Sequence, residues 1–124
     1  MKIFKFEDLI AWKKGQDLAV DIYRAFEHSR DYGFKDQIQR AAVSVSNNIA
    51  EGFDRGSNKE FIRFLYISIA SCSEVKSMLH LSSRLNHLNI DQSNQLIIKT
   101  EEVSRIIRGL IKVIYNKSKV EINK

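Results

Sequence analysis

The absence of proline most restricts the fold of this chain, because none of its 124 residues is proline and only five are glycine. Proline breaks helices, and a glycine inside a helix costs about 1 kcal/mol relative to alanine. With both nearly missing, long uninterrupted helices are the expected structure. Hydrophobic residues make up 44% of the chain and charged residues 28%, which is typical of a folded globular domain rather than a disordered one.

Apolar residues recur at spacings of three and four, which places them on one side of a helix. The predicted stripes of the first three helices are Leu9, Trp12, Ala19, Ile22 and Phe26, then Ile38, Ala41, Ala42, Val45 and Ile49, then Phe61, Leu65, Ser68, Cys72, Val75, Leu79 and Ser82. Short connections make consecutive helices antiparallel neighbours. The sequence therefore predicts a single all-α domain over residues 1–124, an antiparallel up-and-down four-helix bundle with a tail at 118–124. The expected helices lie at about residues 7–28, 35–53, 57–86 and 91–117.

Local signals mark several helix ends. Gly52 and Gly56 bracket the break after the second helix, since glycine adopts the left-handed backbone that ends many helices. Ser57 and Glu60 form a capping box for the third helix, and Asp91 is the expected cap of the fourth. Because the third helix is longer than the first two, one of its ends is expected to project from the bundle.

The fourth predicted helix has an unusually wide apolar arc. Either this helix is deeply buried in its own bundle, or it also contacts another subunit. The main stripe and the residues that widen it are Leu96, Val103, Ile107, Leu110 and Ile114, with Ile106, Ile111 and Val113 beside them.

The net charge of +5 is concentrated near the C-terminus, where residues 103–124 hold six basic residues against one acid. Arg105, Arg108, Lys112 and Lys119 repeat at three, four and seven residues and form one cationic stripe on the fourth helix. One interpretation is a surface that attracts phosphate backbones. The other is the solvated face of an amphipathic helix, whose C-terminal dipole favours lysine. Tyr115 lies near the stripe, either to stack on a base or as a core residue.

Three stretches carry a more specific pattern: F-E-D-L-I-A-W-K-K at 6–14, Y-G-F-K-D-Q-I-Q-R-A-A-V-S-V-S-N-N-I-A-E-G at 32–52, and R-G-S-N-K-E-F-I-R-F-L at 55–65. In these residues the chain resembles the four-helix-bundle proteins of bacterial 23S ribosomal RNA intervening sequences. The most specific part is N-I-A-E-G followed by a set of residues at the family spacing. This set is Arg55, Ser57, Glu60, Phe61 and Phe64.

The resemblance implies a ring-like homo-oligomer, a homopentamer, and no enzyme. A similar protein, the accessory variability protein of diversity-generating retroelements, associates with a reverse transcriptase and nucleic acid through a basic surface. By analogy, RNA, DNA or a nucleic-acid-processing protein is the expected partner. The chain departs from the family at two positions that usually hold proline, near His28 and at Ser46.

Polar residues of the family motif have two possible roles, in a binding or subunit interface or in local structure. Arg40, Ser44, Asn47 and Glu51 follow one face of the second helix, and Asn48 flanks it. The structural interpretation is that these side chains hold the connection to the third helix. The motif residues concerned are Arg40, Asn48, Glu51, Arg55, Ser57 and Glu60.

Catalytic chemistry finds little support in the sequence, so no enzyme, metal or cofactor is expected. His28, His80 and His87 do not form a short metal-ligand pair, and no glycine-rich phosphate loop occurs. The single cysteine, Cys72, lies in an apolar helical run and is expected in the core. No secretory signal or transmembrane segment is recognised, which predicts a cytoplasmic protein that does not associate with membranes.

The leading functional hypothesis is an oligomeric bundle whose basic surface binds RNA or DNA as an accessory to another macromolecule. The alternative is a protein–protein interaction module with no nucleic-acid binding. Salt and charge reversal at the stripe would weaken the first kind of binding, whereas changes in exposed apolar residues would weaken the second.

Overall fold

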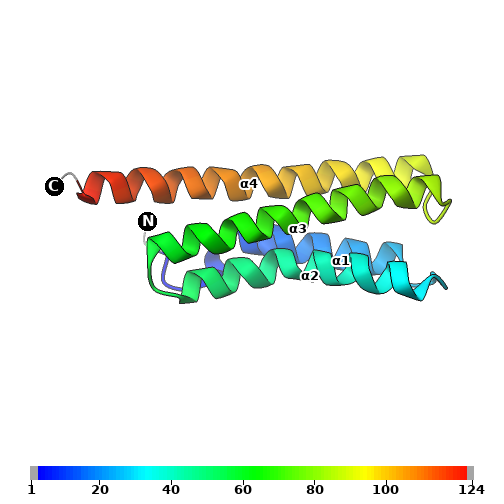
Figure 1. Ribbon diagram of the computed structural model, residues 1–124, viewed down its shortest axis with the longest axis horizontal. Coiled ribbons are helices and arrows are strands. Elements are labelled where there is room, and N and C mark those ends of the chain that lie inside the picture. The colour runs from blue at the N-terminus through cyan, green and yellow to red at the C-terminus, as the bar shows by residue number, and fades with distance from the viewer. Residues whose placement is uncertain (1–2, 123–124) are drawn as a thin grey trace.

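The computed structural model describes residues 3–122, with side chains up to Ser118, and this part of the chain is helical and contains no strand. Its main elements are four helices, which confirms the predicted all-α class (Figure 1). A short 3-10 helix, η1, precedes them. The bounds are Phe6–Asp8 for η1, Ile10–Ala25 for α1, Tyr32–Asp54 for α2, Asn58–Arg84 for α3 and Ile90–Ile122 for α4.

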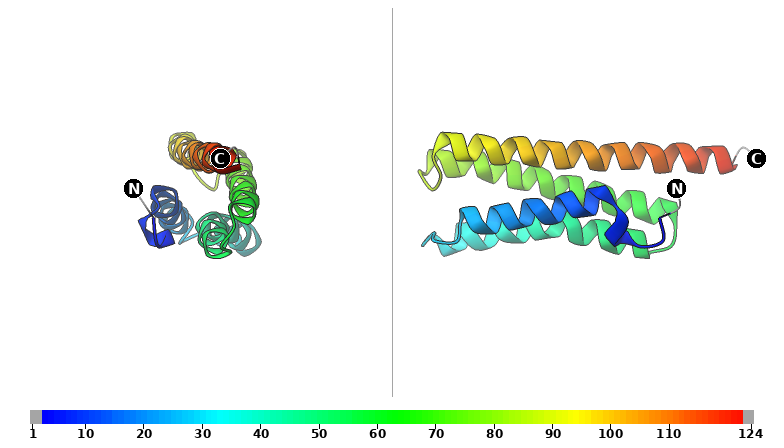
Figure 2. Two further views of the ribbon diagram at one scale, coloured as in Figure 1. Left: turned by 90° about the vertical axis from the view of Figure 1, so that its left-hand side faces the viewer. Right: turned by 180° about the vertical axis from the view of Figure 1, so that it is seen from behind.

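The four helices run alternately up and down, as the short connections predict. Each helix packs closely against its two neighbours, α1 against α2 and α4, and α3 against α2 and α4, while the backbones of the diagonal pairs stay farther apart. The end-on view in Figure 2 shows this arrangement, with the helices at four corners. Two faces of α3 are therefore covered, one by α2 and the other by α4.

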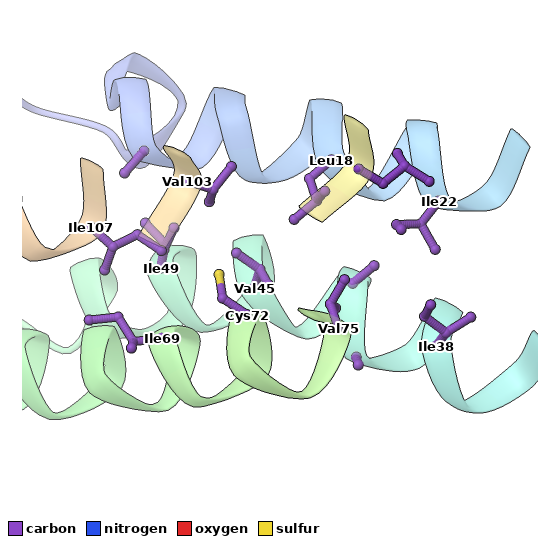
Figure 3. Packing of buried hydrophobic residues seen from close by; sticks show 14 of the residues in the cluster. Leu18, Ile22, Ile38, Val45, Ile49, Ile69, Cys72, Val75, Val103 and Ile107 are labelled. Carbon is purple, nitrogen blue, oxygen red and sulfur yellow. The ribbon is translucent and has the colours of Figure 1, made fainter. Parts of the chain in front are cut away.

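One hydrophobic core fills the interior, and all four helices contribute to it (Figure 3). Leu18, Ile49, Val75 and Ile107 each come from a different helix, and all are almost fully removed from solvent. Burial of such a side chain contributes about 1.5–3 kcal/mol. The predicted stripes of the second and third helices are buried throughout, and Cys72 lies among them.

The first helix is shorter than predicted. It spans Ile10–Ala25 instead of about 7–28, because Leu9 adopts an extended conformation at φ −75° and ψ 127° and its side chain is buried. The preceding turn therefore forms the separate η1 helix. At the other end, Phe26 leaves the helical conformation and packs its ring 5.7 Å from the ring of Phe34.

The second helix begins three residues earlier than predicted, at Tyr32, because the carboxylate of Asp31 accepts a hydrogen bond from the backbone N–H of Phe34 at 3.2 Å. It ends at Asp54, and Gly56 provides the left-handed turn with φ +83°. Gly52 does not mark the break. It lies inside α2 against Phe64, where an added Cβ would come within 2.5 Å of the Phe64 Cβ, so glycine allows α2 and α3 to approach closely.

The third helix starts as predicted, because Ser57 Oγ accepts a hydrogen bond from the Glu60 N–H at 3.2 Å. It ends at Arg84, two residues before the predicted end. The fourth helix is capped by Asn89 instead of Asp91. The Asn89 side chain accepts from the Gln92 N–H at 2.8 Å, and Gln92 Oε1 accepts in return from the Asn89 N–H.

The fourth helix continues to Ile122, so most of the predicted tail at 118–124 is helical. No glycine or proline interrupts its last turns. At 33 residues it is roughly 50 Å long, and its C-terminal end runs past the other helices (Figure 1). The prediction that the third helix would project was therefore wrong, because the projecting helix is α4. No helix within residues 3–122 is long and apolar enough to cross a membrane.

Candidate nucleic-acid interface

Three of the predicted basic residues, Arg105, Arg108 and Lys112, are exposed on the side of α4 that borders α3. Arg108 and Lys112 line a hollow of about 500 Å³ between the two helices. The remaining lining residues are Ile62 and Tyr66 from α3, and Ile111 and Tyr115 from α4. The spacing of three and four residues in α4 thus brings these three cations to one seam of the bundle.

A second hollow of about 270 Å³ follows along the same seam towards the α3–α4 loop. It is more polar, and Arg108 borders both hollows, which makes them one groove. Arg105 lies in this part together with Lys76 of α3. The acid that lies here, Glu101, is 3.9 Å from the Lys76 ammonium. The groove therefore carries four cations and one carboxylate among its lining residues.

The predicted fourth member of the stripe, Lys119, lies in α4 seven residues after Lys112, but its side chain is outside the part that the structure describes. The backbone position continues the line of Arg105, Arg108 and Lys112, since spacings of three, four and seven follow one side of a helix.

Three basic residues of this groove differ in their ion pairing from several basic residues elsewhere in the bundle. Arg40, Arg55 and Arg63 each lie 2.8 Å from a carboxylate, and the Lys99 ammonium contacts Asp21 at 2.6 Å. Over residues 3–118, by contrast, none of the ion pairs involves Arg105, Arg108 or Lys112. Their charge is not neutralised inside the protomer, so the groove keeps a positive potential.

The family-motif residues of α2 make contacts within the bundle. The Asn48 amide donates to the backbone carbonyl and the hydroxyl of Ser44, each at 2.8 Å, and the Ser44 hydroxyl contacts that of Ser71 in α3 at 2.8 Å. The Ser44–Ser71 contact joins α2 to α3, and the Asn48 bonds hold Ser44 from within α2. Arg40 does not reach the α2–α3 connection, because its Nε donates to Asp36 in the same helix.

The remaining motif residues build the turn between α2 and α3. Arg55 donates to Glu51, and Arg63 donates to Glu60, whose pKa this hydrogen bond lowers. The guanidinium groups of Arg55, at the C-terminal end of α2, and of Arg63, in α3, each lie 4.9 Å from the ring centroid of Phe64. Only half of the predicted capping box forms. The Glu60 N–H donates to Ser57 Oγ, but the Glu60 carboxylate accepts from Arg63 instead of the Ser57 N–H.

Sequence reasoning did not identify Tyr66, Ile62 or Lys76, although all three line the groove. They come from α3, between 29 and 43 residues before Arg105 in sequence, and only the packing of α3 against α4 reveals that they line the same groove. Tyr115, for which a core and a surface role were both open, is exposed and lines the larger hollow.

The thiol of Cys72 is poorly suited to chemistry, because burial raises its pKa to about 12. Among the described residues, no group of three or more histidine, cysteine, aspartate or glutamate side chains is placed to hold a metal ion. The absence of enzymatic activity stays a prediction.

The antiparallel packing of four helices, with a basic groove between two of them, places the chain in the class of small helical-bundle proteins. Residues 7–109 match the model of the family described as 23S rRNA-intervening sequence protein, and the chain belongs to that family. This confirms the resemblance seen in its motifs.

A solved structure supports the fold. The chain is similar to a protein of unknown function from the S23 ribosomal protein family of Bacteroides thetaiotaomicron, known from a crystal structure. The two share 23% sequence identity and a TM-score of 0.77, over 83% of this chain and 99% of the other. No curated protein matches the sequence.

Proposed function

We propose that this protein binds RNA or DNA through the α3–α4 groove and acts as an accessory to another macromolecule. The observation that carries the proposal is that Arg105, Arg108 and Lys112 are exposed along one seam with no ion pair among the described residues. Guanidinium groups suit phosphate because their planar donors make paired hydrogen bonds to its oxygens.

Binding of this kind releases counterions and therefore depends strongly on salt. Three phosphate contacts give a slope of log K against log salt of about −2 for single strands and about −2.7 for duplex DNA. The affinity of one protomer should then fall about 20- to 40-fold between 50 and 200 mM salt. A ring of protomers would repeat the groove and steepen this dependence.

The proposal includes assembly of identical subunits, with a homopentamer as the expected form. Supporting it, Phe4 is 84% exposed and Val113 63%, and both border a third hollow of about 400 Å³ between the N-terminal segment and α4. Burial of such residues by a second subunit would remove apolar surface from water. A nucleic-acid-processing protein is the proposed further partner, and a cytoplasmic location fits the single cysteine.

The same exposed apolar residues favour a second candidate function, a protein–protein interaction module without nucleic-acid binding. On this alternative Phe4 and Val113 dock a different protein, and the basic stripe only keeps α4 soluble. Substitution of Val113 by serine would then abolish partner binding, whereas charge changes in the groove would have little effect.

The test compares two triple variants with the same change in net charge. In the first, Arg105, Arg108 and Lys112 are replaced by glutamate. In the control, glutamate replaces Lys13, Lys14 and Arg24, which are exposed on α1, the helix diagonally opposite α3. Fluorescence anisotropy with a mixed-sequence RNA at 50 mM salt should show a loss of at least about 40-fold for the first variant and a much smaller loss for the control. Equal losses would overturn the assignment to the groove.

Light scattering after size-exclusion chromatography tests the assembly separately. A mass of five protomers is expected for the wild type, and Val113→Ser should lower it. A monomeric wild-type protein would remove the oligomer from the proposal and leave the groove of a single subunit as the binding surface.

A further inference from the structure

The larger hollow of the groove combines aromatic and cationic side chains in a way that the basic stripe alone does not require. Tyr66 of α3 and Tyr115 of α4 both line it and are 53% and 60% exposed. Arg108 and Lys112 belong to the same lining. Two tyrosine rings from different helices are thus presented to solvent beside two positive charges.

The floor of this hollow is apolar. Ile111 is buried and Ile62 is half-buried, and both border the space between the tyrosines. A volume of about 500 Å³ falls within the range of about 300–1,000 Å³ that is usual for small-molecule sites. An apolar floor with aromatic walls suits a flat, uncharged ring, while the neighbouring cations suit a phosphate attached to it.

We propose that the hollow takes unpaired bases of single-stranded RNA or DNA, with Tyr66 and Tyr115 stacking on the bases and Arg108 and Lys112 binding the flanking phosphates. The inference rests on the proposed function and adds the class of nucleic acid. Bases in a duplex already stack on one another and present only their edges, so they cannot lie flat on a tyrosine ring.

The second hollow gives the strand a continuation. Arg105 and Lys76 line it beside Arg108, which is shared by both hollows. A strand whose bases enter the larger hollow would place its next phosphates along these side chains. Serine hydroxyls at Ser73 and Ser104 supply uncharged donors in the same stretch. The aromatic part thus selects unpaired bases, and the polar part holds the backbone.

The test measures the affinities of oligo(U) and oligo(dT) 15-mers and of a 15-base-pair duplex at 50 mM salt. The variants are Tyr66→Leu and Tyr115→Leu, which keep an apolar side chain but remove the stacking ring. Tyr23→Leu is the control, since Tyr23 is 46% exposed on α1. Each leucine variant should lose about fivefold or more of its single-strand affinity and little duplex affinity. Tyr115→Trp keeps an aromatic ring and should therefore keep the wild-type affinity for single strands. The control should bind as the wild type does.

The outcomes separate this inference from the function on which it rests. If single strands and duplex bind equally well and both leucine variants match the wild type, stacking is overturned while the basic groove stands. If the wild type binds no nucleic acid at all, both fail. A changed mass in light scattering with unchanged affinity would mean that a second copy occupies the hollow, which overturns the inference.

A measurement on the unaltered protein guards against misfolded variants. Oligonucleotides that contain 5-bromouridine are irradiated in complex with the wild type, and the cross-linked peptides are mapped. Cross-links at Tyr66 and Tyr115 support the inference, for RNA, DNA or both according to the oligonucleotide that gives them. Cross-links confined to α1 or α2 overturn it.

Discussion

The arginines on the two covered sides of α3 differ in their ion pairing. On the side of α2, Arg55 and Arg63 are each bonded to a carboxylate and stacked on Phe64. On the side of α4, Arg105 and Arg108 border an open groove and form no ion pair among the described residues. The first arrangement uses positive charge to fix the turn between two helices. The second leaves it without an ion-pair partner in the described part of the chain, as the proposed binding of nucleic acid requires.

This difference predicts separate roles for the family motif and the basic stripe. The motif N-I-A-E-G, with the arginine, serine and glutamate that follow it, shapes the α2–α3 turn. Its polar side chains form hydrogen bonds within the protomer. Arg105, Arg108 and Lys112 of the stripe form no ion pair among the described residues. Substitutions in the motif should therefore change stability, and substitutions in the groove should change binding.

The largest expected effect distinguishes two aromatic residues of α3 that lie two positions apart. Phe64 is 6% exposed and supports both arginines, so Phe64→Ala should cost about 3–5 kcal/mol of unfolding free energy. Tyr66→Ala should cost much less, because its ring faces the open groove. Urea denaturation measures both. Equal losses would contradict the division between a structural and a binding face.

Two glycines sharpen the same comparison. Gly52→Ala places a Cβ 2.5 Å from that of Phe64 and should destabilise the protein by about 1–3 kcal/mol through overpacking. Gly109→Ala in α4 meets nothing within 4 Å, so the better helix propensity of alanine should raise stability by up to about 1 kcal/mol. Thermal unfolding of the two variants should shift in opposite directions. A stabilising Gly52→Ala would mean that α2 and α3 are packed less closely.

Removal of single arginines should have smaller effects. Arg55→Gln loses an exposed ion pair and a cation–π contact, worth about 0.5–1 kcal/mol together. Arg108→Gln loses no ion pair and should change the unfolding free energy by no more than about 0.5 kcal/mol. Chemical denaturation at low salt compares them. A clear stability loss for Arg108→Gln alone would show that its charge has a structural partner.

The smallest effect concerns acid stability. The hydrogen bond with His87 and then that from the Phe34 N–H lower the pKa of Asp31, and Arg63 lowers that of Glu60. Groups with a depressed folded-state pKa stabilise the fold above their unfolded values and lose that contribution as the pH falls through the folded value. Stability should therefore drop between about pH 5 and 3. Asp31→Asn with Glu60→Gln should make this drop shallower, and an unchanged pH profile would contradict the two assignments.

Much of the fold could be predicted because helical periodicity marks large apolar residues clearly. The stripe Ile38, Ala41, Ala42, Val45 and Ile49 is buried as expected. The stripe predicted for the first helix was less accurate. It left out Leu18, which lies in the core, and it included Trp12 and Ala19, which are only half-buried. Its buried side also includes Ala11 and Gly15, which the predicted stripe left out. Gly15 is buried because α1 lies close to Ser46 of α2.

Helix ends and the groove were harder to predict for different reasons. Asn89 and Asp91 are both suitable caps, and only the reciprocal bond with Gln92 decides between them. The basic half of the groove follows from spacing within one helix. Its aromatic half does not, because Tyr66 and Tyr115 meet through helix packing and no local pattern links them.

The salt dependence of RNA binding for single arginine variants tests the central claim most directly. Slopes of log K against log salt are measured for the wild type, for Arg105→Gln and Arg108→Gln, and for Arg55→Gln and Arg63→Gln as paired controls. Each groove variant should reduce the slope by about 1, whereas the two controls should keep the wild-type slope. Slopes that fall equally for all four variants, or only for Arg55 and Arg63, would contradict the claim that unpaired charge in the α3–α4 groove binds nucleic acid.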